Sequence, residues 1–97
     1  MKNGSFQKSS DKTHKRIKII LMRMRYMIMD DDMEKGILSA KRSKTLFTPS
    51  IKINVKLKQI DINNTQVFVD TEVGKHWRRY PEKKLNHLED TILSSIS

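Results

Sequence analysis

The sequence has no cysteine, and its three glycines and two prolines stand singly along the 97 residues. Without cysteine the chain forms no disulfide bond, no zinc site built on thiolates and no cysteine nucleophile. A glycine-rich phosphate loop is also missing, because Gly4, Gly36 and Gly74 lie far apart. Nucleotide hydrolysis through such a loop is therefore not expected.

Long apolar runs are equally scarce. Residues 1–12 lack the apolar stretch of a secretory signal, and charged residues interrupt the run from Ile17 to Met29. That run is also too short to cross a bilayer as a helix, which needs about 20 apolar residues. We therefore expect a cytoplasmic protein without a transmembrane segment.

Residues with catalytic or metal-binding chemistry show no recognised spacing. His14, His76 and His87 lie far apart, and no pair has the i, i+4 spacing of a helical zinc site. The acidic cluster of residues 30–34 lacks the glycine and glutamate positions of a calcium loop, and no serine lies in a nucleophile elbow. We expect no catalytic residue, no metal and no cofactor, so the protein is predicted not to be an enzyme.

Positive charge is present in excess. The formal net charge is +9, and it arises from three strongly basic blocks, residues 1–25, 37–58 and 75–84, which are offset by net acidic blocks between and after them. A field of this sign concentrates polyanions near the surface, so the candidate partners are nucleic acid, an anionic membrane surface and an acidic protein. The apolar fraction of only 36% favours a modest core, which a homodimer would extend.

The first third of the chain is the least clear. Residues 1–14 are polar, and we predict a flexible basic tail there, followed by one α+β domain over residues 15–97. Residues 16–29 fit a helical stripe and, with one bulge, the alternation of a strand. A helix would place cations at its N-terminus and Asp30–Asp32 at its C-terminus, unfavourable at both ends. This charge pattern favours a strand.

The opposite charge order predicts a helix over residues 32–44, with acids at its start and cations in its last turn. Gly36 weakens this helix by about 1 kcal/mol relative to alanine. Pro49 prevents its continuation.

A β-hairpin is the clearest local pattern. Apolar and polar residues alternate over residues 51–58, and a second strand is predicted over residues 66–73. Asn63 and Asn64 suit a two-residue turn, because asparagine tolerates positive φ. A bulge at Lys58 or Gln59 would set Lys56 opposite Asp70, which would neutralise part of the positive charge.

The C-terminal quarter combines a basic aromatic stretch and a helix. Residues 75–80 are predicted to form a short strand, and Pro81 suits the first position of the last helix. The apolar residues of that helix recur at helical spacing: Leu85, Leu88, Ile92, Leu93 and Ile96.

These elements predict an α+β fold. We expect a small antiparallel sheet of three to four strands, with the C-terminal amphipathic helix and one further short helix packed on it. The element order resembles that of several small RNA-binding architectures, including ribosome hibernation factors, at the level of the fold alone.

The basic aromatic stretch holds most of the candidate binding residues. Aromatic rings stack on exposed bases while neighbouring cations contact phosphates. The alternative for Trp77, the single tryptophan, is packing in the core. The lysines of the polar strand face form a second basic patch. The predicted nucleic-acid-binding residues are Lys75, Trp77, Arg78, Arg79, Tyr80, Lys52, Lys56 and Lys58.

We therefore expect a small, basic, non-enzymatic protein that binds RNA or DNA, in a ribosome-associated or regulatory role. The alternative is a small protein–protein interaction module, an inhibitor or assembly subunit, that forms a homodimer or docks an acidic partner. Strong salt dependence is typical of the first, and indifference to nucleic acid is typical of the second.

Overall fold

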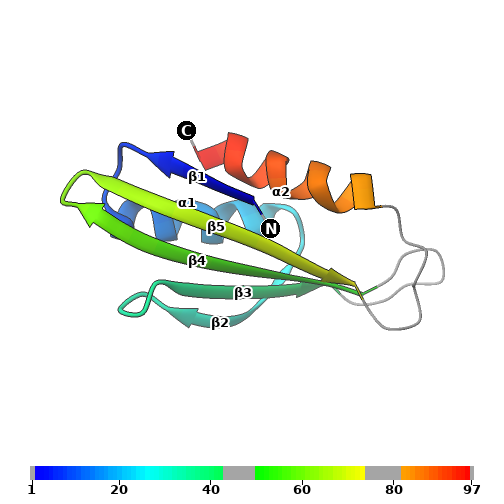
Figure 1. The fold of residues 1–97 in the computed structure, drawn as a ribbon. Helices are drawn as coiled ribbons and strands as arrows, with labels where there is room; N and C mark the ends of the chain where they lie inside the picture. Colours follow the sequence, from blue (N-terminus) through cyan, green and yellow to red (C-terminus); the bar gives the residue numbers. More distant parts are fainter. Residues whose placement is uncertain (1, 43–49, 74–81, 97) are drawn as a thin grey trace.

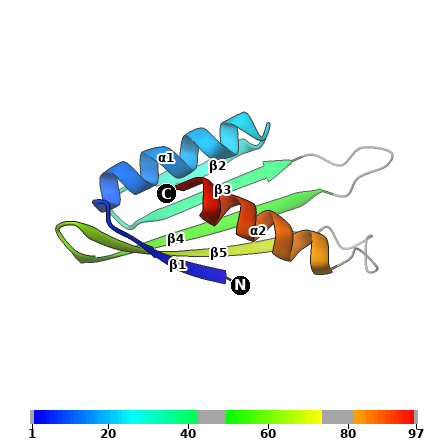
Figure 2. The ribbon, with the colours of Figure 1, turned by 90° about the horizontal axis from the view of Figure 1, so that it is seen from above.

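An antiparallel sheet and two helices make up the part of the chain that the computed structural model describes, residues 2–42, 50–73 and 82–96. The elements are β1 (Lys2–Phe6), α1 (Ser10–Arg23), β2 (Met27–Asp32), β3 (Ile37–Arg42), β4 (Ile51–Asp61), β5 (Asn64–Val73) and α2 (Glu82–Ile96). The strand order is β1-β5-β4-β3-β2 (Figure 1). Both helices lie on the same face of the sheet (Figure 2), so no helix of the described residues covers its other face.

The α+β prediction is confirmed, with a difference in sheet size. The described residues form five strands rather than three to four. The additional strands come from the two segments in which local patterns misled us, residues 1–14 and residues 27–42.

The N-terminal segment is ordered structure rather than the flexible tail that we expected. Its first residues form the edge strand β1, paired antiparallel with β5 from Lys2 opposite Val69 to Phe6 opposite Thr65. Phe6 packs against the core, and Thr65 Oγ1 donates to the carbonyl of Lys8 at 2.9 Å. Backbone pairing and one aromatic side chain therefore order a segment that is too polar to form a core of its own.

The predicted strand over residues 16–29 was wrong, because a helix occupies most of this segment. Helix α1 begins before Arg16, with Ser9 as its N-cap and Asp11 in its first turn. It ends in a Schellman motif, in which Arg25 takes a φ of 65° where glycine is usual. The charge argument failed because the helix ends differ from the assumed ones. An acid occupies the first turn of the actual helix, and Asp30–Asp32 belong to β2 and not to the helix C-terminus.

The predicted helix over residues 32–44 was also wrong. Strands β2 and β3 form a hairpin whose turn contains Gly36 at a φ of 67°. A Cβ atom at this position would lie 2.5 Å from the carbonyl oxygen of Leu57. Asp32 Oδ1 accepts a hydrogen bond from the backbone N–H of Lys35 at 3.1 Å. A left-handed glycine and an aspartate-stabilised turn therefore outweigh the helical charge pattern.

The β4–β5 hairpin is as expected, but its turn and register differ. The turn lies between Asp61 and Asn64, and the register shifts between Gln59 and Asp61, later than the predicted bulge at Lys58 or Gln59. Lys56 is consequently opposite Phe68, whereas the predicted register placed it opposite Asp70. The displacement spans two residues, so the alternation between the two faces is unchanged.

The core lies between the sheet and the two helices. Its fully buried members come from α1, β3, β4, β5 and α2: Ile17, Leu21, Leu38, Ala40, Ile53, Val67, Val69, Ile92 and Ile96.

The predicted C-terminal helix is present as α2, and it carries no basic residue in its last turn. Lys8 Nζ bonds the carbonyl of Ile96 at 2.6 Å, and Arg16 Nε bonds that of Ser95 at 3.3 Å. The β1–α1 loop and α1 thus supply the cations that stabilise the C-terminal end of α2.

Candidate nucleic-acid interface

The predicted site residues fall into two groups. Lys52, Lys56 and Lys58 lie on β4 and are exposed on the helix-free side of the sheet, which we call the open face. Their side chains make no hydrogen bond or ion pair with the described residues. The other five predicted residues, Lys75, Trp77, Arg78, Arg79 and Tyr80, lie outside the described residues. The predicted short strand over residues 75–80 lies outside them too.

The centre of the open face is a shallow groove of about 780 Å³. Phe68 on β5 and Ile37 on β3 lie directly opposite Lys56, one on each side of it. In the next row Asn54 is opposite Ser39, whose Oγ donates to the Asn54 amide oxygen at 3.3 Å. Asp70 lies opposite Asn54 on the other side, so the groove combines an aromatic ring and an apolar side chain with lysine, amide and carboxylate groups.

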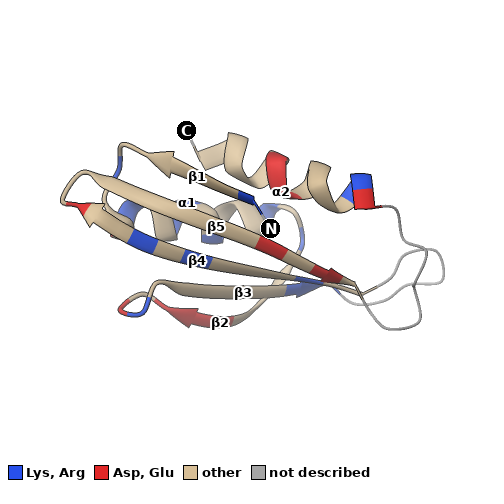
Figure 3. Cartoon of the chain, in the orientation of Figure 1, with Lys and Arg blue, Asp and Glu red and all other residues tan. Residues whose placement is uncertain are grey.

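Charge is divided along the open face. The register places four lysines and five acids of the described residues on it: Lys41, Lys52, Lys56, Lys58, Asp30, Asp32, Asp61, Asp70 and Glu72. Glu72 is opposite Lys52, whereas Lys58 is opposite the neutral Gln66. Figure 3 shows the basic segments of β4 towards the β4–β5 turn and the acidic segments of β5 towards the other end. The half of the face nearest that turn carries Lys56 and Lys58 against one acid, Asp61, and we call it the cationic half.

Phe68 is the functional candidate that sequence reasoning missed. It stands between Val67 and Val69, which are fully buried, and its own ring is partly exposed on the open face. The signal was available, because an aromatic residue at an outward position of an alternating strand is either solvated or a contact residue. We had considered only the aromatic residues of the 75–80 stretch.

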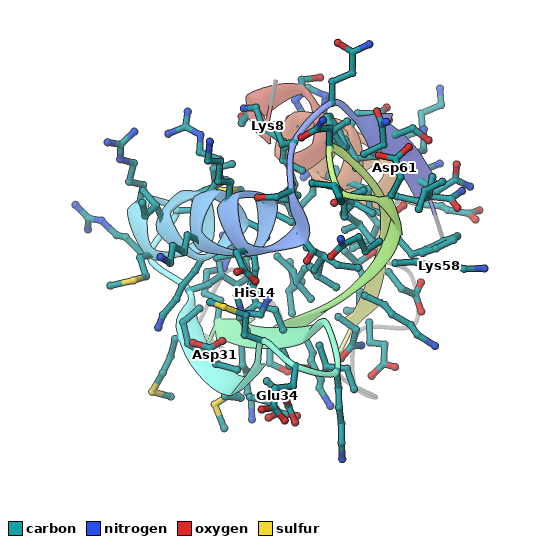
Figure 4. All side chains as sticks on the ribbon, turned by 90° about the vertical axis from the view of Figure 1, so that its left-hand side faces the viewer. Lys8, His14, Asp31, Glu34, Lys58 and Asp61 are labelled. Carbon is teal, nitrogen blue, oxygen red and sulfur yellow. The ribbon has the colours of Figure 1, made fainter. Side chains whose placement is uncertain are left out.

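A second polar cluster lies on the helix-covered side. His14 on α1 is 1% exposed, and its Nε2 lies 2.5 Å from Asp31 Oδ1 on β2. Lys18 Nζ lies 2.7 Å from the other oxygen, Oδ2. These hydrogen bonds, from Lys18 first and His14 second, hold the pKa of the Asp31 carboxyl below its ordinary value. Figure 4 shows His14 pointing from the helix towards Asp31.

This cluster has a structural role. The imidazole is too deeply buried to reach a substrate, and its Nδ1 has no partner among the described residues. The three side chains join α1 to the edge strand β2, whose one neighbour among the described strands is β3. No group of three or more His, Cys, Asp or Glu side chains suited to a metal ion occurs among the residues that the structure describes.

Hydrogen bonding also organises the β4–β5 turn beside the cationic half. Asp61 Oδ1 accepts from the backbone N–H of Asn63 at 2.9 Å and from the Asn64 amide at 2.9 Å. These bonds, chiefly the one from the Asn64 side chain, lower the pKa of Asp61. The carboxylate is therefore committed to the turn and partly satisfied there, close to the lysines of β4.

Comparisons with known proteins add no family. No protein-family model matches the chain, and none of the curated proteins is similar to it in sequence. Within the described ranges, neither helix has the length and apolar character needed to cross a membrane.

Proposed function

We propose that this chain is a small, non-enzymatic protein that binds single-stranded RNA or DNA on the open face of its sheet. The observation that carries the proposal is the pairing of Phe68 with Lys56 at the centre of a face that neither α1 nor α2, the helices of the described residues, covers. Lys58, two residues along the same strand, extends the cationic edge of this pair.

The arrangement supplies both interactions that single-strand binding uses. A ring on a sheet surface offers a platform on which a base stacks, a contact worth about 1–3 kcal/mol per base. Lys56 and Lys58 lie on one face of the strand, about 7 Å apart along it, and would contact successive phosphates. The Asn54 amide beside them offers a polar group to a base edge.

The acids of the open face limit where a polyanion would bind. Asp70 and Glu72 lie towards one end of the sheet, and Asp30 and Asp32 lie on its β2 edge. Like charge repels phosphates from both places. A bound strand would therefore cross the cationic half beside the β4–β5 turn, over Phe68, and continue towards β1, whose outward residues Asn3 and Ser5 are neutral.

The test is the fluorescence anisotropy of a labelled 12-nucleotide oligouridine and of its thymidine counterpart, titrated with protein at several salt concentrations. We expect Phe68→Ala to weaken binding about tenfold, because it removes one stacked base. Lys56→Ala should reduce the magnitude of the slope of log affinity against log salt by about one, the change expected when one phosphate contact is lost. Lys35→Ala, an equal loss of charge in the β2–β3 turn, serves as the matched control. The absence of binding to either oligonucleotide at low salt would refute the proposal.

Homodimer formation stays a prediction, and one observation argues against one route to it. The β2 edge carries Asp30, Asp31 and Asp32 and an irregularity between Ile28 and Asp30. Pairing of two copies through this edge would bring like charges together, and a bulge interrupts a pairing edge. Sedimentation equilibrium of the nucleic-acid-free protein would show whether another surface associates.

A further inference from the structure

The solvent side of α1 differs from that of an ordinary surface helix. The helix buries Ile17, Ile20 and Leu21 against the sheet, as an amphipathic helix should. On the outer side, however, Ile19 is 44% exposed and Met22 is 58% exposed. A single exposed apolar residue is common, but these two lie at i and i+3 and are therefore neighbours on the helix surface.

Three cations surround this apolar pair. Lys12, Lys15 and Arg23 are exposed, and at 100° per residue they fall with Ile19 and Met22 inside an arc of about 100°. We call these five residues the α1 stripe. Its three cationic side chains make no hydrogen bond or ion pair within the described part of the chain. Figure 4 shows long, nitrogen-tipped side chains projecting from α1 away from the sheet.

The other cations of the helix bond to groups elsewhere in the chain. Lys18 pairs with Asp31, and Arg16 bonds the carbonyl of Ser95. The single acid of the helix, Asp11, lies in its first turn, at the opposite end from Met22 and Arg23. The stripe therefore presents unmatched positive charge with an apolar centre, in contrast to the open face, where the lysines of the described residues are accompanied by a slightly larger number of acids.

We propose that the α1 stripe docks an acidic amphipathic helix of a partner protein. Such a helix presents apolar side chains at i, i+3 and i+4, flanked by Glu or Asp, and it would bury Ile19 and Met22 while pairing the three cations. The flexible thioether of Met22 suits an adaptable contact. The stripe and the open face lie on different sides of the molecule, so this docking does not depend on nucleic-acid binding.

Two other polyanions fit the stripe less well. A phosphate backbone would pair the cations but leave Ile19 and Met22 without an apolar partner. A helix that lies in an anionic bilayer inserts a broad apolar face, and the broad apolar face of α1 is already buried against the sheet. Charge together with an apolar centre of two residues therefore favours a protein helix.

The experiment uses the full chain and a synthetic 14-residue amphipathic peptide, with leucines at helical spacing and glutamates on both flanks. Isothermal titration should show binding in the micromolar range. We expect Lys15→Glu with Arg23→Glu to weaken it at least tenfold, and Ile19→Ser with Met22→Ser to weaken it about fivefold. The matched controls are Lys83→Glu on α2 and Ile62→Ser in the β4–β5 turn, where the side chain is 79% exposed, and both should stay within twofold of the parent. Circular dichroism establishes that each variant is folded.

A charge swap provides the sharpest readout. A lysine-substituted version of the peptide should fail to bind the parent protein and should bind the Lys15→Glu, Arg23→Glu variant. A scrambled peptide of equal charge that binds as tightly as the amphipathic one would overturn the proposal, since charge alone would then explain binding. Binding to phosphatidylserine vesicles without binding to the peptide would overturn it in favour of a membrane. Loss of oligonucleotide binding in the stripe variants as large as that in Phe68→Ala would assign the stripe to the nucleic-acid surface instead.

Discussion

The two faces of the sheet are made by the same alternating strands but have opposite roles. On the helix-covered face Leu38, Ile53 and Val69 are fully buried in the core. On the open face their chain neighbours include Ile37, Lys52 and Phe68, which remain partly or largely exposed. Alternation therefore separates the core residues from the residues of the proposed binding face within single strands, and substitutions at adjacent residues should affect different properties of the protein.

The largest expected contrast is between Leu38→Ala and Ile37→Ala. Leu38 is fully buried, and its truncation leaves a cavity that should lower the free energy of unfolding by about 3 kcal/mol. Ile37 lines the open groove, so its truncation should cost less than about 1 kcal/mol. Urea denaturation measures both. Equal losses in the two variants would show that something covers the open face in solution.

A smaller contrast is expected between the neighbouring acids Asp31 and Asp30. Asp31→Asn weakens the bonds to Lys18 and to the buried His14, and should lower the free energy of unfolding by about 1–2 kcal/mol. Asp30 points to the open face, so Asp30→Asn should change it by no more than about 0.5 kcal/mol. The same urea titrations measure the pair. Similar values for both would mean that the cluster does not hold β2 against α1.

The smallest effect is the pH dependence of this difference. The pKa of Asp31 is lowered in the folded state, so its contribution is complete above the ordinary value of about 3.9 and is lost as the pH falls through the folded value. The stability advantage of the parent over Asp31→Asn should therefore persist at pH 7 and shrink below pH ~4. Denaturation curves at pH 7, 4 and 3 provide the comparison. An advantage that instead grew on acidification would contradict the lowered pKa.

Local patterns predicted the fold where one element contains its own complete signal. The β4–β5 hairpin shows dense alternation over residues 51–58, and α2 shows apolar residues at helical spacing. Both were found with the correct faces. The turn was placed one residue too late, because Asp61 organises it through bonds to Asn63 and to the Asn64 side chain.

The α1–β2–β3 region was misread because its boundary signals are weak in the sequence. The N-cap Ser9 lies in a stretch that appeared too polar to fold, and the left-handed residue that follows the helix is Arg25, where glycine is usual. The turn of the β2–β3 hairpin depends on Gly36, which lies within a pattern of charges that also fits a helix. With the ends unknown, the helix dipole argument was applied to the wrong segment.

The candidate site was predicted in part. Lys52, Lys56 and Lys58 lie exposed on one face, as alternation required. The residues opposite these lysines depend on the register of the hairpin. A single sequence specifies that register poorly, because a slip of two residues keeps every side chain on its face but changes its partner. Because of that slip, the residue directly opposite Lys56 is Phe68 and not Asp70.

The sequence by itself determined the charge, the class of fold, the C-terminal helix and the division of the central hairpin into an apolar and a lysine-bearing side. These properties depend on composition and on periodicity over a few residues. Only the tertiary structure decided that residues 2–6 complete the sheet, which acids accompany the lysines, and that unmatched cations gather on α1. Those outcomes depend on backbone pairing and packing between segments far apart in the chain, for which no local pattern carries the information.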